Sequence, residues 1–393
     1  MRPTLLATLL FVAASLSTSP AAAPAARTPV PVPSGHDESL RHEVQRAIDR
    51  GLAWLLTHQN SNGWWTTPDH PAVTALPLIA LNGEPSGKHL KQPSPAIQRA
   101  YAFLLASAKP DGGIYATNMA NYNTSLSLLA LMSANRPEYD AAARKARAFI
   151  VGTQVDFGEK GRLDTPFDGG VGYGNKYSHS DLNNTLVALE ALHHSRRLVA
   201  DNKSADNKDL DWQAAIHFLQ NCQNLPAVNA QPWVVGDAAN KGGFIYYPGN
   251  SMAGGVTNSQ TGRVALRSYG SASYAGLLSY IYADVKRDDA RVIAVLDWLG
   301  GNFTLAENPG MGPQGYYYYL HLMTKALTAA GVHELETKDG SKINWRRELA
   351  LRLMNLQKPD GSWTNDNARW WEKETPLTTS YSLIALEMVW RGL

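Results

Sequence analysis

Cysteine is almost absent from this sequence, and its single residue, Cys222, cannot form a disulfide within the chain. Stability must therefore come from the burial of apolar side chains. An excess of one charge sign is also lacking, because 36 Lys and Arg stand against 34 Asp and Glu, for a formal net charge of +2. No basic cluster exceeds a few residues, so this balance argues against a nucleic-acid partner.

Long apolar runs are missing after residue 26. No later stretch approaches the roughly 20 apolar residues of a spanning helix. We therefore expect no transmembrane segment after signal cleavage, which leaves peripheral membrane contact open. Residues 1–26 combine an early Arg2, an apolar run and a stretch of alanines, which predicts a signal peptide and a periplasmic or secreted protein. The Pro-rich residues 27–38 predict a linker.

Residues 39–393 contain six segments with one shared pattern. Each has an amphipathic helix, a turn with glycine and an aromatic residue, a polar stretch, and a helix that is apolar nearly all round, as in "SLSLLALMSA". The first helix should have one solvent-exposed face, whereas the second should be covered by protein on both sides. With a period of about 50 residues or more, the pattern predicts an all-α fold: a single α/α toroid (α6/α6 barrel) of six helical-hairpin repeats. Period-two alternation is rare, which argues against a sheet.

The turn sequences of these segments resemble a known repeat. "NGWW", "KPDGGIY" and "KPDGSW", with the helix ends "LTHQ", "VGTQ" and "MNLQ", are similar to the QW-type repeats of squalene-hopene cyclases and prenyltransferase-like proteins. The resemblance spans essentially all of residues 39–393, with the fifth repeat the most degenerate. It implies the toroid fold, which also hosts protein prenyltransferases, thioester domains and glycan enzymes. It therefore specifies the architecture more narrowly than the activity.

The glycine-aromatic turns have two interpretations. We interpret them as structural, because glycine permits a positive φ after the outer helix and the ring can pack over the helix ends. The alternative is an aromatic binding surface. The turns are Gly63-Trp64, Gly113, Gly170, Gly243-Phe244 and Gly361 with Trp363.

The polar stretches before the inner helices differ between repeats, so we expect binding there. Inner-helix N-termini converge on one mouth of such a ring, and Tyr and Trp side chains around it favour an apolar, planar or cationic guest. The alternative is that the aromatic residues only fill the ring interior. The predicted ligand-binding residues are Tyr122, Asn123, Tyr173, Tyr177, His179, Asn183, Asn184, Tyr269, Tyr274, Tyr317, His321, Trp370, Trp371 and Glu374; Asp69, His70, Arg267 and Glu372 belong to the same stretches.

The segment "SDLNNT" is the most specific of these stretches. In squalene-hopene cyclases this place holds an Asp-x-Asp-Asp-Thr motif whose middle Asp donates a proton. The resemblance places Asp181 at the first Asp, Asn183 at the proton donor, Asn184 at the third Asp and Thr185 at the Thr. An amide cannot protonate an alkene, which argues against alkene-initiated cyclisation here. Asp181 is the catalytic candidate that remains, and N-capping by Asp181, Asn183 or Asn184 is the structural alternative.

Three functions follow from these residues. The first is an isomerase or cyclase acting on an isoprenoid, with Asp168, Glu372 or Glu374 as another source of acid. The second is a non-catalytic toroid that binds a peptide, glycan or lipid at its aromatic mouth. The third is a glycan-processing enzyme with carboxylates drawn from Asp164, Asp168 and Asp181.

We expect no metal site and no cofactor. The lone Cys222 falls on an outer helix, away from the mouth where a zinc ligand would be needed. His193 and His194 are adjacent on one helix, and adjacent helix positions point about 100° apart, so they do not chelate one ion together.

Overall fold

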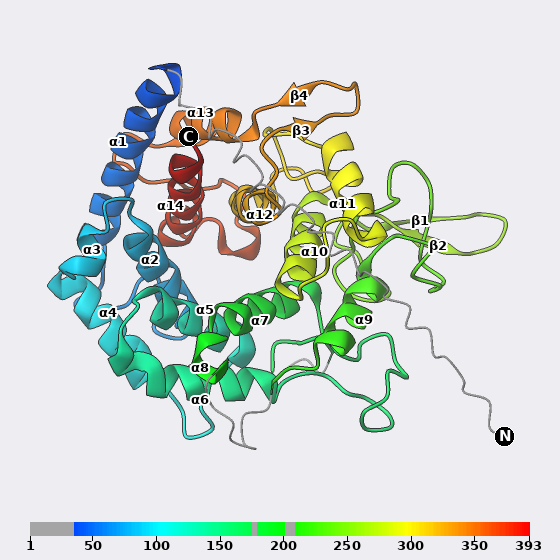
Figure 1. Cartoon of the computed structure of the whole chain (residues 1–393), viewed down its shortest axis with the longest axis horizontal. Helices are drawn as coiled ribbons and strands as arrows, with labels where there is room; N and C mark the ends of the chain where they lie inside the picture. The colour runs from blue at the N-terminus through cyan, green and yellow to red at the C-terminus, as the bar shows by residue number, and fades with distance from the viewer. Residues whose placement is uncertain (1–34, 175–178, 201–208) are drawn as a thin grey trace, which may run out of the picture.

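Six inner helices surround the axis of the molecule in the computed structural model, which describes residues 35–174, 179–200 and 209–393. Each inner helix contacts the next, and α14 contacts α2, so the ring is closed (Figure 1). The predicted all-α toroid of six hairpins is confirmed. The inner helices are α2 (Ala72–Gly83), α5 (Ala120–Ser133), α7 (Leu182–His194), α10 (Gly270–Tyr282), α12 (Tyr316–Ala329) and α14 (Thr375–Gly392).

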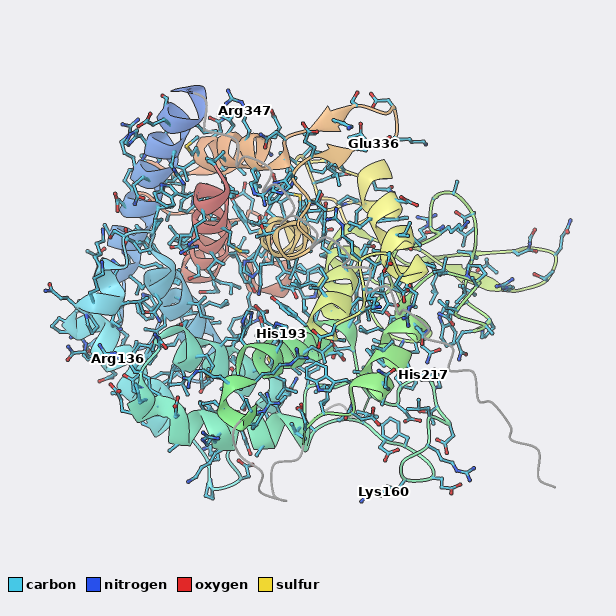
Figure 2. All side chains as sticks on the ribbon, in the orientation of Figure 1. Arg136, Lys160, His193, His217, Glu336 and Arg347 are labelled. Carbon is cyan, nitrogen blue, oxygen red and sulfur yellow. The ribbon has the colours of Figure 1, made fainter. Side chains whose placement is uncertain are left out.

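Six outer helices form a second layer around the inner ring. They have one buried face: α6 buries Ala143, Ala146 and Ile150 at spacings of three and four residues. Charged side chains such as Arg136 and Arg347 project from the periphery (Figure 2). The outer helices are α1 (Gly35–Thr57), α4 (Pro95–Ala106), α6 (Asp140–Val151), α9 (Trp212–Cys222), α11 (Ala290–Gly301) and α13 (Trp345–Leu356).

Short elements occupy the connections between these helices. Strand β1 (Gly255–Thr257) pairs antiparallel with β2 (Val264–Leu266), with Gly255 opposite Leu266, and β3 (Leu335–Glu336) pairs with β4 (Lys342–Ile343). The remaining short elements are α3 (Lys88–Lys91), α8 (Arg197–Ala200), η1 (Pro137–Tyr139) and η2 (Arg369–Trp371). None of them forms part of either helical layer.

The N-terminal region is described only from residue 35 onward. The expected signal peptide, residues 1–26, lies outside the described residues. Helix α1 begins at Gly35, so residues 35–38 of the expected linker are helical. No helix in the described part of the chain is both long enough and apolar enough to span a bilayer.

A glutamine at the end of an outer helix ties each of several repeats to the next. The side-chain amide of Gln59 donates to the carbonyl oxygens of Gly63, in its own turn (3.0 Å), and of Ala96, in the next outer helix (2.8 Å). Gln154 and Gln223 make the corresponding pair of hydrogen bonds in their repeats. The recurrence of glutamine in the sequence therefore reflects a contact between neighbouring hairpins.

The same contact closes the outer layer. Gln357, in the last repeat, donates to the carbonyl oxygens of Gly361 and Ala47, each at 2.9 Å, and Ala47 belongs to the first helix. Gly361 has a φ of +97°, and a Cβ there would lie 2.7 Å from the carbonyl oxygen of Arg50. Glycine is required at this position both by its backbone conformation and by the approach of helix α1.

The residue after each turn is anchored to the inner helix. Trp65 is fully buried, its indole N–H donates to the Leu55 carbonyl at 2.9 Å, and its backbone N–H donates to the Thr74 hydroxyl at 3.2 Å. The buried ring is thus Trp65 rather than the predicted Trp64, because the anchored position follows the glycine by two residues in this repeat. Backbone N–H groups at the equivalent positions of other turns donate to Thr124, Thr185, Ser273 and Thr379.

Candidate functional site

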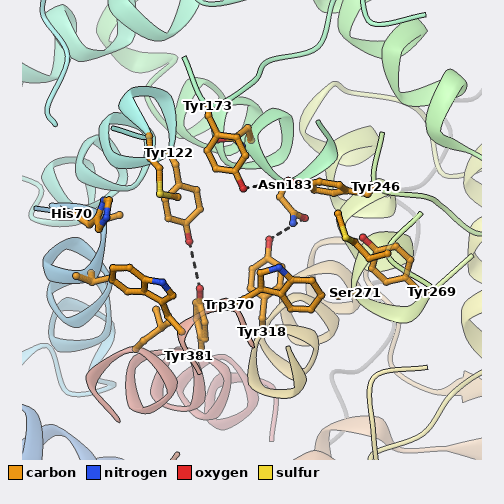
Figure 3. Close-up of a pocket in the computed structure, with 17 residues that line it drawn as sticks. His70, Tyr122, Tyr173, Asn183, Tyr246, Tyr269, Ser271, Tyr318, Trp370 and Tyr381 are labelled. Carbon is orange, nitrogen blue, oxygen red and sulfur yellow. Dashed lines mark hydrogen bonds between the residues drawn. The ribbon is translucent and has the colours of Figure 1, made fainter. Parts of the chain in front are cut away.

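A cavity of about 240 Å³ lies at the end of the ring where the inner helices begin. All six inner helices, or the residues just before them, contribute to its wall. The wall is mainly aromatic (Figure 3), and its described lining contains no Asp, Glu, Lys or Arg. The aromatic lining residues are His70, Tyr122, Tyr173, Tyr246, Tyr269, Tyr318, Trp370, Trp371 and Tyr381; the others are Ala72, Val73, Met119, Asn183, Asn184, Met252, Ser271 and Leu377.

Tyrosine hydroxyls of the wall are hydrogen-bonded to one another between different repeats. The Tyr173 and Tyr246 oxygens are 3.2 Å apart, and those of Tyr122 and Tyr381 are 3.5 Å apart. The Tyr318 hydroxyl donates to Oδ1 of Asn183 at 3.4 Å. Burial raises the pKa of Tyr173 to about 12, so its hydroxyl is neutral at physiological pH. Most of these hydroxyl groups therefore already have a hydrogen-bond partner within the wall.

Two tryptophans cover the mouth of the cavity. Trp370 and Trp371 are 42% and 45% exposed and have positive φ angles of 54° and 67°. The Trp370 ring packs over Gly315, where an added Cβ would lie 2.8 Å from Cε3 of the indole. The Trp371 ring lies edge-on to His70, with 5.1 Å between the ring centroids. A strained turn thus holds both indoles at the entrance.

Asp181 caps helix α7 and lies behind the cavity wall. One carboxylate oxygen accepts the Asn184 backbone N–H at 2.9 Å, and the other accepts the Asn184 side-chain amide at 2.7 Å. The side chain is fully buried, and this burial raises the pKa of Asp181 to about 6. Asn183 and Asn184 line the cavity, whereas Asp181 does not.

Asn123 and His321 are buried but do not line the cavity. Oδ1 of Asn123 accepts the backbone N–H of Ala72 at 3.0 Å, so a residue of α5 caps helix α2. The His321 ring lies beside that of Tyr381, with centroids 4.9 Å apart. Burial holds the pKa of His321 well below its ordinary value, so this imidazole is neutral.

Tyr274 and Tyr317 also lie away from the cavity, although both were predicted at the mouth. The Tyr274 ring packs against Tyr319, at 5.6 Å between centroids, in the contact between α10 and α12. The Tyr317 ring packs against Tyr316 at 5.5 Å. Of the four consecutive tyrosines that begin α12, Tyr318 is the one that lines the cavity, because successive helix positions point in different directions.

Two further predicted residues, His179 and Glu374, fall outside the wall. His179 packs against Tyr247, with 4.4 Å between ring centroids. Glu374 is exposed at the start of α14, where its side chain makes no capping hydrogen bond. Tyr177 lies outside the described residues.

The carboxylates expected for glycan chemistry do not meet at the cavity. Asp164 is exposed in the connection between α6 and α7. Asp168 is buried in the same connection, where it accepts the backbone N–H groups of Phe157 (2.8 Å) and Thr165 (2.7 Å). Burial acts to raise the pKa of Asp168, but these hydrogen bonds outweigh it and the pKa is lowered. No two of the predicted carboxylates, Asp164, Asp168 and Asp181, therefore face one substrate at the cavity.

Glu372 is a second buried cap. Its carboxylate accepts the backbone N–H groups of Tyr318 at 2.7 Å and of Tyr317 at 3.3 Å, and the side-chain amide of Asn365 at 2.6 Å. Burial raises its pKa. This carboxylate holds the start of α12 and does not line the cavity.

Tyr246 and Tyr381 are lining residues that the sequence analysis missed. Tyr246 follows Gly243 by three residues, as the predicted Tyr173 follows Gly170, so alignment of the two turns would have found it. Tyr381 lies six residues after Thr375, the first residue of α14, and so nearly two turns into the helix. The wall therefore extends below the polar stretches on which the prediction was based.

Comparison with known proteins identifies the architecture. No family model matches the chain. A segment of 84 residues is 36% identical to the drimenyl diphosphate synthase of Streptomyces showdoensis, but it spans 20% of this chain and 15% of that protein.

Solved structures match over most of the chain. A variant of the type II terpene cyclase MstE from Scytonema, in complex with geranylgeranyl dihydroxybenzoate, has a TM-score of 0.51 at 14% identity, covering 91% of this chain and 100% of that one. An inactive α-1,6-mannanase variant of Salegentibacter, in complex with α-1,6-mannotriose, has a TM-score of 0.55 at 10% identity, covering 89% and 100%. The shared feature is the α/α toroid.

Among the described residues, no group of three or more His, Cys, Asp or Glu side chains is placed to hold a metal ion. Cys222 is buried as a free thiol at the end of α9, and burial raises its pKa. The described lining of the cavity presents aromatic rings, hydroxyls and amides.

Proposed function

We propose that the cavity binds an apolar isoprenoid and does not protonate it. The observation that carries this proposal is the composition of the wall, which is aromatic and aliphatic and has no carboxyl group in its described lining. Asn183 lines the cavity at the position where the cyclase resemblance puts a proton donor. Protonation of an alkene needs a strong acid in contact with it, and an amide does not supply one.

The aromatic wall favours an isoprenoid over a glycan. Among the neighbours, the MstE structure holds geranylgeranyl dihydroxybenzoate and the mannanase holds α-1,6-mannotriose. Glycosidases place two carboxylates across the bond that they cleave. Here Asp168 instead accepts backbone N–H groups within a connection, and Glu372 caps helix α12. A wall of rings whose hydroxyls already pair with each other offers dispersion contacts and few free polar groups.

The N-terminal sequence supports a place of action outside the cytoplasm. The basic start, apolar run and alanines of residues 1–26 are typical of an exported protein. We infer that the isoprenoid is bound after export, in the periplasm or outside the cell.

The test combines binding with product analysis. Purified protein is titrated with farnesol, geranylgeraniol and squalene while tryptophan fluorescence is recorded, because Trp370 and Trp371 line the site. Mass spectrometry then examines the recovered ligand. We expect saturable binding and an unchanged ligand. A Trp371→Ala variant should weaken binding, whereas Trp64→Ala, outside the cavity, should not.

Two results would contradict the proposal. A cyclised product would show that the protein is a catalyst whose acid lies elsewhere. Failure of all three compounds to bind, with the fold intact by circular dichroism, would show that the cavity does not receive an isoprenoid.

A further inference from the structure

Two buried carboxylates lie close to the cavity, and no Lys or Arg is among its described lining residues. Asp181 and Glu372 are buried directly behind the wall, at the starts of α7 and α12. In the described part of the chain neither forms an ion pair with Lys, Arg or His, and no basic residue lines the cavity. The charge of His179 lowers the pKa of Asp181, but burial outweighs it. Neither carboxylate therefore has a salt-bridge partner in the described part of the chain, although the Arg369 guanidinium lies over Trp370 at the mouth, 5.0 Å from the ring centroid.

Most of the helix N-termini at the cavity are already capped by side chains. Six converging N-termini would by themselves favour an anion, because their free N–H groups carry partial positive charge. Four of them are already occupied by buried acceptors: Asn123 on α2, Asp181 on α7, Asn308 on α10 and Glu372 on α12. An anionic headgroup, such as a diphosphate, would meet neither free donors at these ends nor a Lys or Arg in the lining.

The wall itself attracts cations. Tyrosine and tryptophan rings carry negative charge on their faces, and their attraction for an ammonium group grows when the group is desolvated. Eight such rings surround the cavity (Figure 3). The Asn184 side chain, which donates to Asp181 at 2.7 Å, is the layer that separates this carboxylate from the guest.

We propose that the cavity selects an apolar guest that carries a positive charge, such as a tertiary or quaternary ammonium on a prenyl chain, and discriminates against prenyl diphosphates. This inference rests on the proposed binding of isoprenoids and specifies the headgroup. The aromatic rings and the two buried carboxylates replace the water that a cation loses on entry. A diphosphate loses its water without such compensation.

The test compares four ligands with one prenyl chain, by titration calorimetry at pH 8. They are farnesyl-trimethylammonium, its neutral tert-butyl isostere, farnesol and farnesyl diphosphate. We expect the ammonium compound to bind at least about tenfold more tightly than its isostere, and the diphosphate to bind most weakly. Equal affinities for the ammonium compound and its isostere, or tightest binding of the diphosphate, would overturn the inference. Binding of farnesol tests the underlying function separately.

Two variants connect the preference to the buried charges. Asp181→Asn and Glu372→Gln retain acceptor groups for capping while removing the charge. Each should reduce the ratio of ammonium to isostere affinity, because a shift of the wall residues would change both affinities together. Asp168→Asn removes a buried carboxylate that is not at the cavity, and it should leave the ratio unchanged. An unchanged ratio in both Asp181→Asn and Glu372→Gln would contradict the role given to these carboxylates.

Discussion

Replacement of Asp181 by Asn should stabilise the protein at alkaline pH. In the folded state burial raises the pKa of Asp181 to about 6 from a reference of 3.8. A group whose pKa is raised by folding stabilises the folded state below its unfolded pKa, and this contribution is lost as the pH rises through the folded pKa. The stabilising contribution of the protonated Asp181 is therefore lost between about pH 4 and pH 6. At roughly 1.4 kcal/mol per pKa unit, the ionised form costs about 3 kcal/mol above this range.

The asparagine variant removes this cost but not the cap. Its side-chain oxygen can still accept the Asn184 backbone N–H, while the hydrogen bond from the Asn184 amide, 2.7 Å long in the native protein, is lost. One such bond contributes about 1 kcal/mol. We therefore expect the free energy of unfolding of Asp181→Asn to exceed that of the native protein by about 2 kcal/mol at pH 8, and to be about 1 kcal/mol lower at pH 4.

Urea unfolding followed by circular dichroism at both pH values measures these differences. Asp168→Asn is the matched control of opposite sign, because hydrogen bonds lower the pKa of Asp168 despite its burial. That carboxylate stabilises the fold above its unfolded pKa, so its loss should be most harmful at pH 8. If Asp181→Asn instead destabilises the protein at pH 8 and not at pH 4, the carboxylate is favoured as an anion and the reasoning is refuted.

Three further predictions concern the framework. Trp363→Ala should lower the free energy of unfolding by about 3–5 kcal/mol in urea titrations, because the ring is fully buried and its N–H donates to Leu353. Gln357→Ala should cost about 1–3 kcal/mol and speed hydrogen exchange in α1, since it breaks the link between the last and first repeats; unchanged exchange would contradict this role. Glu387→Gln should raise the melting temperature at pH 8 but not at pH 4. Burial raises the pKa of Glu387, so the stabilisation that the protonated carboxyl gives is lost as the pH rises. Equal shifts of the melting temperature at both pH values would argue against this cause.

The fold could be predicted because the same local sequence pattern recurs from hairpin to hairpin. Gln59 and Gln357 mark helix ends, and Gly361 marks a turn that only glycine fits. The apolar inner helices indicate burial on all sides. These signals are local in sequence and recur, so one degenerate repeat does not obscure them.

The cavity was only partly predictable, because its wall depends on helix rotation. Tyr122 and Tyr173 line it, as the polar stretches suggested, but Tyr274 packs between helices instead. An inner helix that is apolar all round gives no periodic signal for the side that faces the axis. Tyr381 was missed for the same reason. The role of Asp181 as a cap was foreseen only as one of two alternatives.

The closure of the ring has a consequence for chain connectivity. Arg41, near the start of α1, donates to the Trp390 carbonyl at 3.2 Å and lies over that indole at 4.4 Å from its centre. The two ends of the described ring are therefore neighbours, and a short linker could join them. New termini in an exposed connection, such as the tip between β1 and β2, would then leave every contact between hairpins in place. A circular permutant of this kind should fold with the same cavity, since no hairpin in a closed ring is the first or the last.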